Sequence, residues 1–104
     1  MSEDSQIIVP PSFVELFMEP GRTRPSLPAQ LIAARCEVCE DLAHLLSERA
    51  RKLLWETGIA ECDVLERVHR GLLDPASGVD PREAAWVTKR LAELLEWEIP
   101  TDLD

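Results

Sequence analysis

The clearest candidate for chemistry in this 104-residue chain is a pair of cysteines in the segment Cys36-Glu-Val-Cys39. Redox proteins place such a pair at a helix start, where unpaired backbone N–H groups lower the pKa of the first thiol. Here the pair lies about two turns inside a predicted helix, which disfavours redox chemistry. A zinc site needs two further ligands, and the sequence offers only Cys62, His44 and His69, with no second CxxC or HxxxH. We favour a packing role, since a buried cysteine behaves as a small hydrophobe.

A second pattern places a carboxylate three residues before each histidine, in the pairs Asp41–His44 and Glu66–His69. Di-iron bundle proteins use this spacing to point two ligands from one helix face. Such a site also needs bare carboxylates from other helices, and nothing in the spacing selects them. Because the chain holds 20 acidic residues, chance explains both pairs better. A metal-binding helical bundle that uses these Asp/Glu-x-x-His pairs is therefore an alternative function, with Cys36 and Cys39 as further candidate ligands.

Signatures of catalysis are otherwise missing from the sequence. Its four glycines never cluster into a phosphate-binding loop, and neither GxSxG nor HExxH occurs. A chain of this length without a marked nucleophile or cofactor loop is a poor candidate for an enzyme. The sequence thus predicts no catalysis and no cofactor.

The charge balance points to protein partners. The formal net charge of −9, from 20 acidic and 11 basic residues, repels phosphate backbones and anionic lipid. Nucleic-acid and membrane-surface binding are therefore disfavoured, although an acidic surface also suits a nucleic-acid mimic, which is a second alternative. An acidic amino terminus, an odd number of cysteines and no apolar stretch of membrane-spanning length predict a cytoplasmic protein with reduced thiols.

The element expected to position most of these residues is one amphipathic helix over residues 28–57, about 45 Å long. Pro28 suits its first turn, Ser26 is a candidate cap, and Gly58 suits a left-handed stop. Two apolar stripes run along it. The first, called the seam, is rich in small residues and consists of Ile32, Cys36, Cys39, Ala43, Leu46, Ala50 and Leu53. The second, called the ridge, consists of Leu31, Val38, Leu42 and Leu45. Two stripes predict contact with more than one neighbouring helix.

Shorter helices are expected on either side of the long one. A helix over 11–19 carries Phe13 and Phe17, which predict a core plug in preference to an exposed binding ridge. Helices over 61–70 and 81–97 follow, the first ended by Gly71 and the second started by a capping box of Asp80 and Glu83. An acidic tail occupies 98–104.

An extended arm is expected over residues 1–10. Its β-branched residues Ile7, Ile8 and Val9 either cover their own core or pair with the same segment of a second chain.

Together these elements predict an all-α fold, a small four-helix bundle-like single domain with one long central helix. The long helix exceeds what its partners can cover, so Leu53, Leu54 and Trp55 are expected to be exposed. These three residues and the arm are the predicted interaction sites. The sequence favours a small acidic protein–protein interaction module, a regulator or adaptor that forms a homodimer and binds a protein partner.

Four segments of the chain resemble a family of short, uncharacterised proteobacterial proteins, some of which carry the automatic label "ATPase with chaperone activity". The segments are Ile8-Val-Pro-Pro-Ser-Phe-Val-Glu-Leu-Phe17, Cys39-Glu-Asp-Leu-Ala43, Val64-Leu-Glu-Arg-Val-His-Arg-Gly-Leu72, and Trp86 through Trp97. The resemblance covers most of the chain and implies a bacterial source. It implies no activity for any particular residue.

Overall fold

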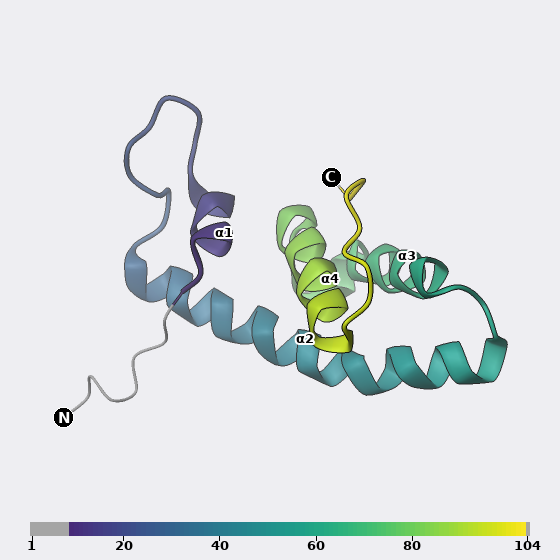
Figure 1. The fold of residues 1–104 in the computed structure, drawn as a ribbon. Coiled ribbons are helices and arrows are strands. Elements are labelled where there is room, and N and C mark those ends of the chain that lie inside the picture. Colours follow the sequence, from purple (N-terminus) through teal and green to yellow (C-terminus); the bar gives the residue numbers. More distant parts are fainter. Residues whose placement is uncertain (1–8, 104) are drawn as a thin grey trace. The chain divides into compact units, whose positions relative to one another are not determined.

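The computed structural model describes residues 9–103, which form helices and no strand (Figure 1). The α-helices are α1 (Pro11–Val14), α2 (Ala29–Thr57), α3 (Glu61–Leu72) and α4 (Pro81–Leu95), and the 3₁₀ helices are η2 (Glu15–Phe17) and η3 (Pro75–Ser77). The all-α fold with one long helix is therefore confirmed. Within the described range, no helix is long and apolar enough to cross a membrane.

The chain divides into two compact units inside α2, the first up to Val38 and the second from Cys39 onward. The sequence predicts a single domain, and the structure divides the chain into these two compact units. The first unit holds α1, η2 and the beginning of α2, and the second holds the rest of α2 with α3 and α4. Of the predicted amino-terminal arm, Ile7 and Ile8 lie outside the described residues, and Val9 is half-buried.

In the first unit, α1 begins with Pro11, whose missing N–H costs nothing in a first turn. The helix tightens into η2 and ends at Phe17, two residues before the predicted end, because Met18 is extended and forms an isolated bridge with Pro25. Phe13 and Phe17 are buried, with exposed fractions of 0% and 7% and ring centroids 5.5 Å apart. The prediction that these two phenylalanines form a core plug, and not an exposed binding ridge, is confirmed.

The start of α2 differs by one residue from the prediction. The helix begins at Ala29, and the carbonyl of Pro28 accepts the backbone N–H groups of Leu31 and Ile32. Pro28 rather than Ser26 therefore takes the capping position, and the N–H of Ser26 donates to the carbonyl of Phe17.

The two stripes of α2 differ in their exposure to solvent. The seam is confirmed, since Leu46 and Leu53 are half-buried and the other members are buried. The ridge is exposed at Leu31, Val38 and Leu45, where the exposed fractions are 52%, 46% and 74%. The predicted second neighbour is therefore wrong for these three residues. In the second unit the reason is that α3 and α4 both meet α2 on the seam side, at Ala50.

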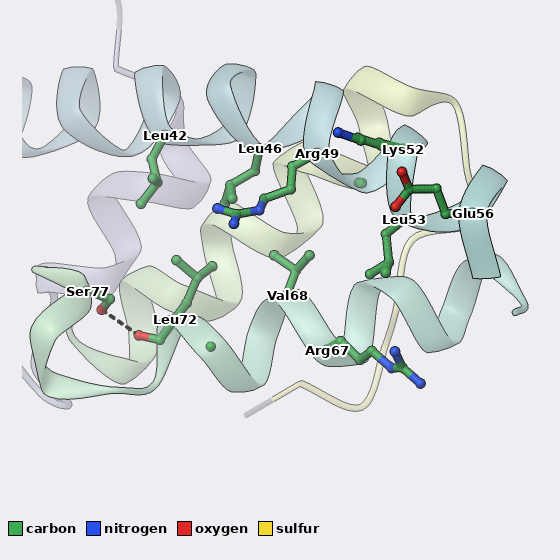
Figure 2. A pocket seen from close by; sticks show the side chains of 12 residues that line it. Leu42, Leu46, Arg49, Lys52, Leu53, Glu56, Arg67, Val68, Leu72 and Ser77 are labelled. Atoms are coloured by element: carbon green, nitrogen blue, oxygen red, sulfur yellow. Dashed lines mark hydrogen bonds between the residues drawn. The ribbon is translucent and has the colours of Figure 1, made fainter.

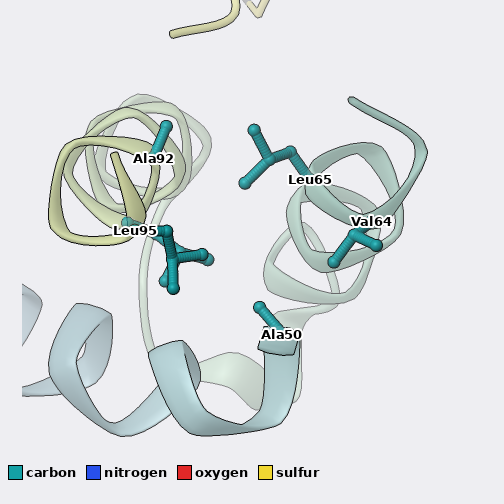
Figure 3. Close-up of a cluster of buried hydrophobic side chains, with 6 residues drawn as sticks. Ala50, Val64, Leu65, Ala92 and Leu95 are labelled. Atoms are coloured by element: carbon teal, nitrogen blue, oxygen red, sulfur yellow. The ribbon is translucent and has the colours of Figure 1, made fainter. Parts of the chain in front are cut away.

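The core of the second unit lies where α2, α3 and α4 meet (Figure 3). α2 contributes the small side chain of Ala50 to the buried part of this core. The buried members of this core are Ala50, Val64, Leu65, Leu91, Ala92 and Leu95, and the half-buried residues packed on it are Leu46, Leu53, Leu54, Ile59, Val68 and Trp97. This cluster positions the faces of α2 and α3 that form the candidate site.

The ends of α3 and α4 are set by tertiary contacts as well as by local signals. Gly71 does not end α3, because the next residue, Leu72, is 6% exposed and extends the helix into the core. The capping box of Asp80 and Glu83 at the start of α4 is confirmed. That helix ends at Leu95, two residues early, where Glu96 turns left-handed and the N–H of Trp97 donates to the carbonyl of Ala92.

Candidate interaction surface

An open groove of about 620 Å³ runs between α2 and α3 in the second unit (Figure 2). Most of its lining is apolar, and a few charged side chains stand beside the apolar surface. The lining residues are Leu42, Leu46, Arg49, Ala50, Lys52, Leu53, Glu56, Arg67, Val68, Gly71, Leu72 and Ser77. The groove is thus an open, mostly apolar surface with a few charged side chains at its edges.

The helical periodicities of α2 and α3 build the floor of this groove. Leu46 and Leu53 are seven residues apart and therefore lie on one face of α2, and Val68 and Leu72 are four apart on α3. Figure 2 shows all four side chains pointing into the space between the two helices. Leu46, Leu53 and Val68 also pack against the core, so the floor is held in place from behind.

Charged side chains in the groove are mainly cationic. Arg49 and Lys52 come from α2 and Arg67 from α3, and Glu56 is the one carboxylate of the lining. All three cations are exposed, and within residues 9–103 none of them forms an ion pair. A locally positive groove in a chain of net charge −9 is a specific feature that the overall composition does not predict.

The predicted interaction residues of α2 are only partly exposed. Trp55 is 88% exposed, as the sequence predicts. Leu53 and Leu54 are half-buried and pack against the core, because α3 folds back on that side of α2. Their predicted exposure is therefore wrong. Leu45, at 74% exposed, is a stronger surface candidate, and its place on the ridge was the sequence signal for it.

A polar cluster links α2 to α4 on another face of the same unit. The guanidinium of Arg90 donates to both carboxylate oxygens of Glu40 and, through Nη1, to Glu93. The hydrogen bonds from Arg90 hold the pKa of Glu40 below its ordinary value of 4.5, and the same pairing raises the pKa of Arg90. This cluster joins α2 to α4 through paired charges.

The metal candidates on α2 do not converge. His44 Nε2 lies 2.9 Å from Glu40 Oε2, so its partner is the residue four before it rather than Asp41. Asp41 itself is exposed. Cys36 and Cys39 are buried, at 4% and 0% exposed, as the packing interpretation predicts.

The candidates on α3 lie beside a different groove, of about 890 Å³, which α3 forms with the carboxyl-terminal segment. Glu66 pairs with Arg70 at 3.4 Å and is exposed. His69 lines the groove, and its Nε2 atom is buried with no hydrogen-bond partner in the described chain. Across residues 9–103, no group of three or more His, Cys, Asp or Glu side chains is placed to hold a metal ion.

Comparisons with known proteins add no assignment. No protein-family model matches the chain, and neither the curated proteins nor the solved structures include a significant match. The resemblance to the proteobacterial family stays a prediction.

Proposed function

We propose that this protein is a small acidic protein–protein interaction module of the bacterial cytoplasm, acting as a regulator or adaptor without catalysis and associating with a second copy of itself. The observation that supports this proposal is the exposed apolar surface of α2. Trp55 and Leu45 are 88% and 74% exposed, and an apolar groove lies between α2 and α3. Large apolar side chains exposed together with a groove mark binding surfaces in water-exposed proteins.

The charge of the molecule is consistent with this role. A net charge of −9 keeps isolated molecules apart at long range, so association depends on short-range apolar contact. Association through α2 therefore strengthens as salt screens the repulsion.

Self-association is tested by measuring the molar mass with size-exclusion chromatography and light scattering at tens of micromolar protein. We expect a mass above the 11.7 kDa of one chain, and a shift toward that value in Leu45→Glu and Trp55→Ala. Ile99→Glu is the matched control, because Ile99 is an exposed apolar residue outside α2, at 42% exposed. A wild-type mass of one chain at all concentrations tested contradicts self-association.

A further inference from the structure

The groove between α2 and α3 has the length of a helical ligand. Its lining on α2 runs from Leu42 to Glu56, which spans about 21 Å along the helix axis. Side chains from α2 and α3 form its two walls, and Figure 2 shows the leucines of α2 facing Val68 and Leu72 of α3. A groove between two helices accepts a third helix, whose apolar face enters at positions i, i+4 and i+7.

Gly71 leaves an unfilled space on the α3 side of the groove. It lies inside α3, where glycine is less stable than alanine, and its φ is not positive. A Cβ added at Gly71 would meet no atom within 4 Å. Neither the backbone nor the packing of the described chain therefore requires glycine here. A glycine that lines a groove leaves room for the backbone of an occupant.

The charges beside the groove define the chemistry of that occupant. Arg49, Lys52 and Arg67 lie along the apolar lining without an ion pair in the described chain, opposed by one lining carboxylate, Glu56. An occupant with carboxylates on both flanks of its apolar face pairs with these cations. A basic occupant would leave them facing like charges.

We propose that the groove between α2 and α3 binds an acidic amphipathic helix of a partner protein, with its apolar face between the helices and its carboxylates on Arg49, Lys52 and Arg67. This proposal rests on the proposed role as an interaction module and names the chemistry of the partner. The partner backbone passes closest at Gly71, where no side chain occupies the space.

The test uses a fluorescein-labelled synthetic peptide of about 15 residues, long enough to span the groove as a helix. Its leucines follow the i, i+4, i+7 pattern and its flanking residues are glutamates, and a scrambled peptide of the same composition is the control ligand. Binding to the full chain is followed by fluorescence anisotropy at low and high salt. We expect saturable binding of the amphipathic peptide, at least about tenfold weaker binding of the scrambled one, and loss of affinity with salt.

Two variants locate the binding. Arg49→Glu is expected to weaken the peptide affinity about tenfold, and Arg51→Glu, a charge reversal at an exposed α2 position outside the groove lining, to leave it unchanged. Gly71→Leu is expected to weaken binding while raising the unfolding temperature, because leucine is the better helix former. If this variant is more stable and yet binds the peptide more weakly, the loss of affinity comes from the blocked groove and not from unfolding.

Several outcomes overturn the proposal. These are no saturable binding of the amphipathic peptide, an equal effect of Arg49→Glu and Arg51→Glu, and full affinity in Gly71→Leu. Loss of self-association in Arg49→Glu also overturns it, because the occupant is then a second copy of the chain. If the chain self-associates but binds no peptide, the proposed function stands and only the assignment of the groove as a binding site is wrong.

Discussion

Glu40 of α2 and Arg90 of α4, 50 residues apart in the sequence, are joined by a two-pronged ion pair. Arg90 Nε lies 2.9 Å from Glu40 Oε1, and Arg90 Nη2 lies 2.9 Å from Glu40 Oε2. Both side chains are 32% exposed, so water screens the pair in part. The two parallel hydrogen bonds hold α2 and α4 in one register. Apolar packing is not directional and does not fix this register by itself.

Removing the charge of Glu40 tests what this pair contributes. We expect Glu40→Gln to lower the free energy of unfolding by about 1 kcal/mol, because a charge-assisted bidentate contact is lost at a partly exposed site. Urea unfolding followed by circular dichroism measures the change. Glu48→Gln is the control, since Glu48 is exposed on α2. Equal losses in the two variants would show that the pair contributes nothing specific.

The same pair predicts a pH dependence. The pKa of Glu40 lies below its ordinary 4.5 in the folded protein, so the unfolded chain takes up the proton first as the pH falls. Its stabilisation is therefore fully present above about pH 4.5 and is lost as the pH falls through the lowered pKa. The stability difference between wild type and Glu40→Gln should be constant above that pH and shrink below it. A difference that persists unchanged in strong acid contradicts the assignment.

The left-handed Glu96 predicts a stabilising substitution. Its φ of 61° is unfavourable for a residue with a Cβ, and its negative charge lies at the carboxyl end of α4, where the helix dipole disfavours it. We expect Glu96→Gly to raise the free energy of unfolding by about 1 kcal/mol. The control is Glu98→Gly, which removes a charge beyond the helix without changing a left-handed residue. If Glu96→Gly raises the free energy of unfolding no more than the control does, the left-handed backbone at Glu96 is not strained.

Thiol reactivity tests the packing role of the CxxC. Cys62 is exposed and should react with a thiol reagent at once, whereas Cys36 and Cys39 are buried and should react only as the structure opens. We expect one rapid equivalent by absorbance, and none in Cys62→Ser. A second rapid equivalent in the wild type would instead support accessible CxxC chemistry.

The two histidines should respond in opposite directions to the same substitution. His69→Leu removes a buried Nε2 that has no partner within the described residues and is expected to raise the free energy of unfolding by about 1 kcal/mol. His44→Leu removes a hydrogen bond to Glu40 and should lower it slightly. Thermal unfolding compares the two. Destabilisation by His69→Leu would indicate that Nε2 has a partner in solution.

Much of the helical layout was predictable because its signals are local. The capping box of Asp80 and Glu83 and the left-handed stop at Gly58 depend only on neighbouring residues, and both occur as predicted. The seam was predictable for a related reason, since side chains three and four apart share a helix face wherever the helix lies. Gly71 is the instructive failure, because burial of Leu72 outweighs the local tendency of glycine to end a helix.

The sequence alone therefore determined that this chain is helical, where α2 ends, and that the seam of α2 is buried. Only the tertiary structure decided that Leu53 is half-buried while Leu45 is exposed, that Glu40 meets Arg90, and that cations line an apolar groove. The physical reason is the distance along the chain over which each effect acts. Helix signals act within one or two turns, whereas the exposure of a face and the partner of a charge depend on which distant helix packs there.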